Sequence, residues 1–488
     1  MAYPSLILMG IGLGSDLALR SYVPPEIPPS QPETPTEILQ PDSPTNNQAD
    51  TDTDTYPEGG LEAWGVVFGS FCCLLCVFGV INSAAVFELL FSKNQLSDHS
   101  HTQISWIFSL YLFTIYFLGT LAGPVFDVYG HRLLVLVGSI CLVVSLMLLS
   151  IATSYYQIIL TFSILSGIGG ALLNTPAFAT IAHYFFLRRG LATGIAASAG
   201  GIGGIIFPLV LRRTLPTLGF AWSMRILGFI LLAVLIPANL LLRSRVSTRQ
   251  RSNRSASTSS TSDDEAPAPA ASASKAKSAW PDLHAFKTPQ FTLCCAGIFL
   301  MEYGVLIPLT YIMSYATAHN IATSDTFVLP ALLNAGSVAG RVIPGLLADK
   351  LGRFNMLLVT MAGCAITVLA MWLPVGVSGS KPLLTAFTSL LGFMSGGNVS
   401  LVPVCIGQLD VCGTERFGRC LSAAMLVAGF GTLTGIPIGG AILGESIGNV
   451  GEVRWTGLVL FSGIAYVVSF GAFFAARVVA VGWGLKVY

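Results

Sequence analysis

Twelve long apolar segments, arranged as six plus six around one polar stretch, constrain the fold of this chain more than any other feature of its sequence. A helix needs about 20 apolar residues to cross a bilayer, and each segment is close to that length. Helices are expected rather than a barrel, because barrel strands would read as short alternating segments. The segments lie near residues 64–91, 104–126, 132–152, 157–183, 190–212 and 222–243, and then near 288–317, 326–348, 354–376, 382–408, 419–443 and 455–480.

The low charge content agrees with this pattern. Only 10% of the 488 residues are charged, whereas 53% are hydrophobic. A soluble domain carries about 25% charged residues, so this chain could not cover a soluble surface of its size. The net charge of +1 argues against a nucleic-acid partner. The sequence therefore predicts an all-α, multi-pass membrane protein whose main surroundings are the lipid bilayer.

The polar stretches divide the chain into five parts. Residues 1–62 are rich in Pro, Thr, Ser and Asp, a composition that cannot bury enough apolar surface to fold, and we expect a disordered cytoplasmic tail. Residues 63–243 are expected to form an N-terminal six-helix bundle, and residues 288–482 a C-terminal one. Residues 244–287 are expected to be a disordered cytoplasmic loop, and residues 483–488 a short cytoplasmic tail.

The two halves repeat one motif. "GPVFDVYGHR" joins the second and third segments, and "GLLADKLGR" joins the eighth and ninth. Glycine, aspartate and glycine recur at the same spacing in both, and internal symmetry of this kind is how many secondary transporters are built. The motif residues are Gly123, Asp127, Gly130 and Arg132 in the first half, and Gly345, Asp349, Gly352 and Arg353 in the second.

Basic residues in the short loops predict the orientation, because loops rich in Lys and Arg stay on the cytoplasmic side. Arg212 and Arg213 fall on the opposite side and weaken the bias without reversing it. Both termini are therefore expected in the cytoplasm, with the plasma membrane as the first expectation and the vacuolar membrane as the alternative. The residues that set the bias are Arg132, Arg188, Arg189, Lys350, Arg353, Arg416 and Arg419.

The paired G-x-x-x-D-x-x-G-R/H motif resembles the cytoplasmic loop motif of the major facilitator superfamily, over residues 57 to about 482. "PEGGLEAWGVV" (57–67) and "LLNAGSVAGRVIPGLLADKLGR" (332–353) resemble signatures of its monocarboxylate porter family, and the Pro/Ser/Thr-rich tail is similar to those of fungal members. The resemblance implies twelve transmembrane helices in two pseudo-symmetric six-helix bundles. It also implies that the repeated loops brace one conformation during transport; simple anchoring at the interface is the alternative.

Two positions depart from the proton-coupled mammalian members of that family. Those proteins carry a functional lysine late in the first segment, where Asn82 stands here. They also carry an aspartate one helical turn before the arginine of the eighth segment, where Ser337 precedes Arg341. The chain therefore lacks part of the charge set that those relatives use to couple lactate-like acids to protons.

Arg341 and Glu302 are the main candidates for contact with a substrate. A charge at the bilayer centre costs about 2.5–3.5 kcal/mol on insertion scales, so such charges usually serve a function. The guanidinium of Arg341 suits a carboxylate because its fork can bind both oxygens, although it could also reach the interface. Glu302, near the middle of the seventh segment, is a candidate proton carrier or a structural partner of Arg341.

Four further polar residues on apolar segments are candidate substrate contacts. Asn82, Asn334, Asn398 and Tyr311 could hydrogen-bond a ligand, or they could tie helices together, which asparagine often does in membranes. No G-x-x-x-x-G-K-[ST] loop, metal-ligand cluster or catalytic arrangement is present, so neither an enzyme nor a cofactor or metal site is predicted.

Taken together, these features predict a secondary active transporter that works by alternating access on a small organic anion or carboxylate-bearing metabolite. Export of a fungal secondary metabolite is one reading, with protons as a candidate coupling ion. The alternatives are uptake of a monocarboxylate or vitamin-like solute, and a nutrient sensor that keeps the fold without transport.

Overall fold

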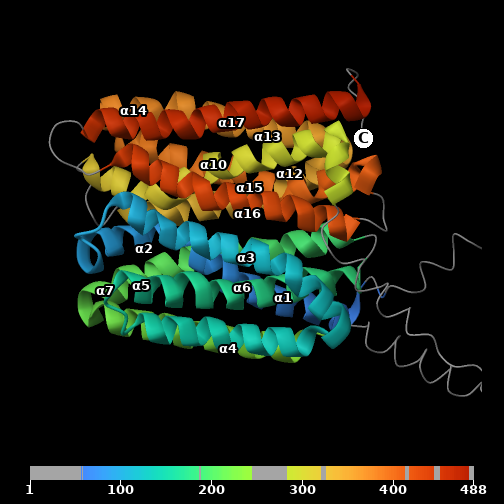
Figure 1. Cartoon of the computed structure of the whole chain (residues 1–488), viewed down its shortest axis with the longest axis horizontal. Coiled ribbons are helices and arrows are strands. Elements are labelled where there is room, and N and C mark those ends of the chain that lie inside the picture. Colours follow the sequence, from blue (N-terminus) through green and yellow to red (C-terminus); the bar gives the residue numbers. More distant parts are fainter. Residues whose placement is uncertain are drawn as a thin grey trace, which may run out of the picture. The chain divides into compact units, whose positions relative to one another are not determined.

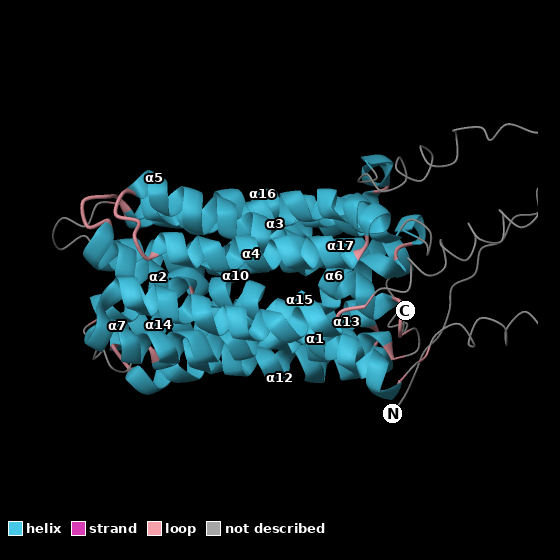
Figure 2. Cartoon of the chain, turned by 90° about the horizontal axis from the view of Figure 1, so that it is seen from below, coloured by secondary structure: helices cyan, strands magenta, loops and turns pink. Residues whose placement is uncertain are grey.

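The computed structural model describes residues 57–482 of the chain, except 58, 186–187, 244–282, 320–325, 413–416 and 445–450. Every regular element in this described part is a helix, and the helices run side by side along one direction (Figures 1 and 2). The predicted all-α fold is confirmed. Most of residues 1–62 and 244–287, and all of residues 483–488, lie outside the described part, so those predictions stay untested.

The N-terminal half contains the first six predicted segments, and its π-helical turns continue neighbouring α-helices. The first segment is interrupted at Ser83, so that α1 is followed by the short α2. The elements are α1 Gly60–Asn82, α2 Ala84–Leu90, η2 Phe91–Gln95, α3 His101–Tyr129, α4 His131–Leu149, α5 Tyr155–Ile158, η3 Ile159–Leu165, α6 Ser166–Ala182 and α7 Arg189–Leu241.

The C-terminal half contains the other six segments and has a corresponding order. Its elements are η4 Leu283–Lys287, α10 Pro289–Ala318, α12 Val328–Leu351, α13 Arg353–Thr367, η5 Val368–Trp372, α14 Leu373–Ser378, α15 Lys381–Gln408, η6 Asp410–Cys412, α16 Phe417–Leu443 and α17 Gly451–Val481. The described part holds 11 helical stretches that are long and apolar enough to cross a membrane. The longest, Leu191–Leu241, has 51 residues and combines the fifth and sixth segments, so the prediction of twelve segments is consistent with this number.

Glycines with a positive φ angle make the sharp turns between consecutive spans. Gly130 (φ 75°) separates α3 from α4, and Gly352 (φ 89°) separates α12 from α13. Gly219 (φ 74°) reverses the chain inside α7. Residues with a side chain rarely adopt such angles, so glycine is needed at these turns. Two of the three belong to the repeated motif, which explains why the motif keeps its second glycine.

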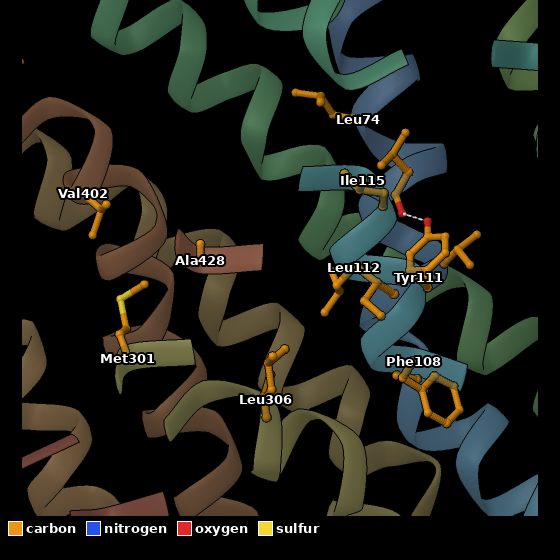
Figure 3. Close-up of a cluster of buried hydrophobic side chains, with 14 of the residues drawn as sticks. Leu74, Phe108, Tyr111, Leu112, Ile115, Met301, Leu306, Val402 and Ala428 are labelled. Atoms are coloured by element: carbon orange, nitrogen blue, oxygen red, sulfur yellow. Dashed lines mark hydrogen bonds between the residues drawn. The ribbon is translucent and has the colours of Figure 1, made fainter. Parts of the chain in front are cut away.

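The packing of the helices repeats between the halves. Span two packs along span eleven as α3 against α16, and span eight packs along span five as α12 against α7. Exchanging the halves converts one of these contacts into the other. Apolar side chains from both halves fill the interior, among them Phe108 and Ile115 on α3 and Met301 and Leu306 on α10 (Figure 3). The pseudo-symmetric arrangement predicted from the repeated motif is thus present.

The bundle has two distinct ends. The "motif end" carries the turns at Gly130 and Gly352, and the "far end" carries α2, η2 and α5. Each span runs from one end to the other, so Arg341 near the middle of α12 and Glu302 near the middle of α10 lie between them.

Candidate functional site

Three predicted site residues meet one face of α7, although they come from two other helices. Asn82 ends α1, whereas Asn334 and Arg341 lie on α12. Each side chain donates a hydrogen bond to a backbone carbonyl of α7, so spans one and eight are both tied to span five. The acceptors are Gly200 O for Asn82 (2.9 Å), Gly204 O for Asn334 (3.2 Å) and Ala197 O for Arg341.

Irregularities in two helices help to provide the carbonyls that Asn334 uses. The carbonyl of Gly204 would normally accept from the N–H of residue 208, but Pro208 has none. The carbonyl of Asn82 is left unused by α1 because Val86 N–H bonds Ser83 O instead. Asn334 Nδ2 lies 3.3 Å from Asn82 O and 2.8 Å from Pro330 O of its own helix, so its two N–H groups are shared among these and Gly204 O. Asn334 therefore joins the two halves, as the structural alternative for this residue predicted.

Glycines of α7 allow α12 to approach this closely. A Cβ atom at Gly204 would overlap the amide group of Asn334, and one at Gly201 would lie 2.6 Å from Val338 Cγ2. A Cβ at Gly200 would lie 3.2 Å from a terminal nitrogen of Arg341. Small residues at helix contacts are typical of membrane proteins, where van der Waals packing drives helix association. Arg341 and Asn334 of α12 therefore pack against the glycine-rich stretch of span five.

Arg341 is buried between the halves, and no carboxylate among the described residues forms an ion pair with it. Its side chain is 7% exposed, and its Nε has no hydrogen-bond partner among the described residues. Within the same part of the chain, the structure forms no ion pair between Arg341 and Glu302. The structural pairing that the sequence left open is therefore not formed. A buried guanidinium without a carboxylate is costly unless another anion occupies the space beside it.

Glu302 is buried on α10 against α16, near a tyrosine of the other half that sequence reasoning missed. The Glu302 side chain is 7% exposed, and a Cβ at Gly431 of α16 would lie 3.3 Å from its own Cβ. Tyr116 on α3 lies within electrostatic reach of both Glu302 and Arg341. Tyr116 escaped notice because an aromatic residue in an apolar segment reads as core. Its proximity to two buried charged residues of the other half gives no signal in the sequence.

Asn398 and Ser337 lie inside the C-terminal half. Asn398 Nδ2 is 3.4 Å from Cys364 Sγ, and its Oδ1 has no partner within the described residues. Ser337, at the position of the missing aspartate, is buried against α15, where a Cβ at Gly396 would lie 2.5 Å from its carbonyl oxygen. The aspartate of the proton-coupled relatives would therefore point to α15 from here.

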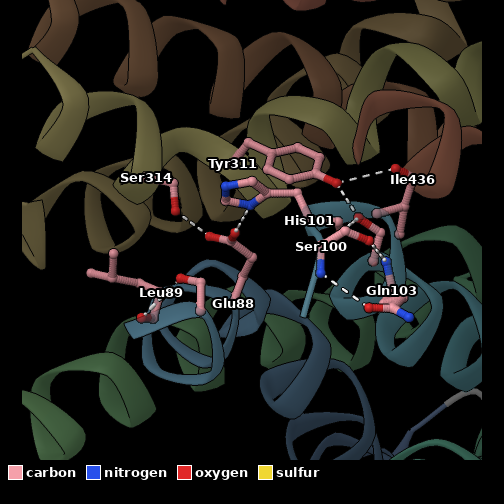
Figure 4. A network of polar contacts seen from close by, with 10 residues as sticks. Glu88, Leu89, Ser100, His101, Gln103, Tyr311, Ser314 and Ile436 are labelled. Carbon is pink, nitrogen blue, oxygen red and sulfur yellow. Dashed lines mark hydrogen bonds and ion pairs between the residues drawn. The ribbon is translucent and has the colours of Figure 1, made fainter. Parts of the chain in front are cut away.

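Tyr311 is part of a polar network at the far end, shown in Figure 4. Its hydroxyl bonds Ser105 Oγ of α3 and donates to Ile436 O of α16 at 3.1 Å. Glu88 of α2 accepts a hydrogen bond from Ser314 of α10 and lies 3.4 Å from His101 Nδ1. These contacts join the two halves. Tyr311 thus lies apart from Arg341, and Glu88 and His101 were not predicted as site residues.

The repeated loop motifs end the spans at the motif end. Asp127 and Asp349 lie in the last turns of α3 and α12, and their side chains fall outside the described part of the chain. Arg132 is exposed, and Arg353 is half-buried. The predicted role of these loops in bracing one conformation therefore stays a prediction. A Cβ atom at the first motif glycine, Gly123 or Gly345, would meet nothing within 4 Å.

Comparison with known proteins identifies the family. The model of the Major Facilitator Superfamily matches residues 66–410. A riboflavin transporter of Saccharomyces cerevisiae is 35% identical over 449 residues, covering 91% of this chain and 83% of the relative. An MFS-type transporter of Penicillium oxalicum is 34% identical, covering 88% of this chain and 94% of the relative. The fujikurins efflux protein of Gibberella fujikuroi is 33% identical, covering 86% and 83%.

Proposed function

Because this chain belongs to the major facilitator superfamily and is a membrane transporter, we propose that it moves a small organic anion or a carboxylate-bearing metabolite by alternating access. The proposal concerns the substrate, since fold alone does not name one. It rests on the interface between the halves, where transporters of this type hold their substrates.

One observation carries the proposal: a buried guanidinium lies between the halves, and the part of the chain that the structure describes offers it no carboxylate partner. Arg341 donates one hydrogen bond to Ala197 O, whereas its Nε has no hydrogen-bond partner among the described residues. A substrate carboxylate would supply both the missing charge and the missing acceptor, and bidentate binding suits its planar shape. Tyr116, near Arg341 from the opposite half, could donate to the same anion. A substrate held from both halves would favour closure around it.

Relatives support export of a fungal metabolite as the direction of transport. The fujikurins efflux protein aligns over 86% of this chain. We place this protein in the plasma membrane, with residues 1–62, 244–287 and 483–488 in the cytoplasm and therefore the motif end facing inward. We also propose the monocarboxylate porter family as its closest branch, on the signatures at 57–67 and 332–353.

Uptake of a vitamin-like solute is the second candidate. The riboflavin transporter of Saccharomyces cerevisiae aligns over 91% of this chain. Aromatic residues such as Tyr116, Phe113 and Phe430 line the α3–α16 contact and could stack on a planar ring system. This candidate does not use the charge of Arg341, which is why it ranks second.

Deleting the gene and comparing metabolites inside and outside the cell tests the proposal. Export predicts that an anionic metabolite accumulates inside the deletion strain and falls in the medium, with restoration by the wild-type gene. Uptake of a flavin-like solute predicts instead that the deletion strain takes up added riboflavin more slowly than the wild type. If neither set of compounds changes, the substrate proposal is wrong.

A further inference from the structure

A buried acid–base pair lies at the far end, away from Arg341 and Glu302. Glu88 on α2 is 1% exposed, and its Oε1 is 3.4 Å from His101 Nδ1 on α3. The other oxygen, Oε2, accepts a hydrogen bond from Ser314 of α10 in the opposite half (Figure 4). The pair therefore sits where the two halves close against each other.

The two facing atoms of this pair lack any hydrogen-bond partner. Glu88 Oε1 and His101 Nδ1 are both buried, and both are unsatisfied within the described part of the chain. A single proton shared between them satisfies both atoms, because one then donates and the other accepts. Without an added proton the neutral ring can still donate from Nδ1, but the buried carboxylate then keeps its charge with no cation beside it among the described residues, which is costly.

Few other titratable groups face the pair. Tyr311 on α10 is electrostatically close to Glu88, but its hydroxyl already forms hydrogen bonds with Ser105 Oγ and Ile436 O. Ser314, the other α10 group at Glu88, does not titrate near neutral pH. Lys93, on the η2 turn that follows α2, is exposed. Among the described residues, His101 is therefore the base that can balance Glu88.

Packing around the pair shows that this end is closed. A Cβ atom at Gly440 of α16 would lie 2.9 Å from His101 O and from Thr102 Cα. Toward the motif end, a Cβ at Gly123 of α3, Gly194 of α7 or Gly345 of α12 would meet no atom within 4 Å. Helices α16 and α3 are thus in close contact beside His101, whereas these three glycines toward the motif end have free space beside them.

We propose that Glu88 and His101 form a proton-binding site that controls closure of the far end. In the closed state the pair holds one proton between two buried atoms, and in an open state water solvates both groups. The closed state therefore binds more protons, so acid favours closure and alkali favours opening. His101 begins α3 at the far end and its side chain is 26% exposed, so the proton exchanges with that side of the protein. It sets the conformational equilibrium and is not carried across.

With the orientation proposed above, on which this assignment of sides rests, acidity outside the cell would hold the carrier closed to the outside. For a site that differs by one bound proton between states, the equilibrium shifts by up to tenfold per pH unit. An exporter regulated in this way would release substrate more slowly into an acidic medium. Glu302 and Arg341 play no part in this device.

Spin-label distance measurements on the purified full chain in lipid nanodiscs test the proposal without any substrate. Labels at Asn94→Cys on η2 and Ser378→Cys at the end of α14 report the far-end separation of the halves. In this parent protein, raising the pH from 5 to 8 should shift the distance distribution from short to long. The variants Glu88→Gln and His101→Gln should show the same distribution at both pH values.

His99→Gln is the matched control, because this neighbouring histidine stacks on Tyr155 and not on Glu88. It should keep the pH response of the parent. Ser314→Ala, which removes the link between the halves but keeps the pair, should shift the distribution toward long distances while still responding to pH. The proposal is overturned if the parent does not respond to pH, or if both pair variants, eluting as monodisperse proteins, respond like the parent. Loss of transport in an Arg341 variant would leave every one of these results unchanged.

Discussion

Arg341 is the residue on which the substrate proposal depends, and replacing it with lysine separates charge from shape. Arg341→Lys keeps a cation but loses the planar fork, so we expect transport of the identified anion to fall about 10–100-fold, the equivalent of one charge-assisted hydrogen bond. Initial transport rates in membrane vesicles, at equal protein abundance, measure this. Arg225→Lys is the control, because Arg225 contacts Ser150 and Trp222 instead. Unchanged transport by Arg341→Lys would reject the anion contact.

Glu302 has a different predicted role, since a carboxyl group buried near the bilayer centre can bind and release a proton during transport. We expect Glu302→Gln to abolish substrate accumulation driven by a proton gradient while leaving substrate counterflow within about threefold of wild type. The reason is that counterflow needs the moving halves but no net proton movement. Both rates can be measured in the same proteoliposomes. A variant that loses both to the same extent would show that Glu302 serves binding or folding only.

The sequence could predict which residues are unusual but not which ones meet. Arg341, Glu302 and Asn334 stand out as polar groups in apolar segments; the structure buries all three, and Arg341 and Asn334 bond across the halves. Nothing in the sequence indicated that Asn334 would meet the carbonyl that Pro208 leaves unused at Gly204, since that contact depends on how α12 packs on α7. Tyr116, Glu88 and His101 were missed for a similar reason: partners far apart in the chain define their environment.

The small residues of helix α7 determine how closely α12 can pack against it. Gly204→Ala should destabilise the protein, because its added Cβ would overlap Asn334, and overpacking of this kind costs about 1–3 kcal/mol. Gly194→Ala on the same helix meets no atom within 4 Å and should be neutral or stabilising by up to about 1 kcal/mol. Thermal unfolding in detergent should therefore give Gly204→Ala the lower midpoint of the two. Equal midpoints would mean that α12 can retreat from α7 without cost.

At the scale of elements, the length of each apolar segment predicted where the spans lie, but it did not predict the break inside the first span. The predicted segment 382–408 corresponds to α15 Lys381–Gln408, because apolar length alone decides where a span begins and ends. The interruption of the first segment at Ser83 was not predicted, although it frees the carbonyl of Asn82. The reversal at Gly219, by contrast, lies between the predicted segments 190–212 and 222–243, as expected. A break such as the one at Ser83 depends on packing against other helices.

For the whole molecule, the repeat in the sequence predicted the symmetry but not the conformation. Two copies of one motif imply two similar halves, and the paired contacts α3–α16 and α7–α12 follow from that. Which end is closed depends on contacts between the halves, such as Ser314 with Glu88, and these have no counterpart in the repeat. A symmetric sequence is compatible with either end closed, because a transporter must visit both states.

The orientation of the whole molecule can be tested with two single-cysteine variants. All native cysteines are buried or half-buried, so background labelling by a charged maleimide should be low. Asn94 on η2 and Lys287 on η4 are exposed at opposite ends. Because basic loops stay in the cytoplasm, Asn94→Cys should be labelled in intact cells, and Lys287→Cys only after permeabilisation. The reverse pattern would place the motif end outside, and acidity would then act on the Glu88–His101 pair from the cytoplasm.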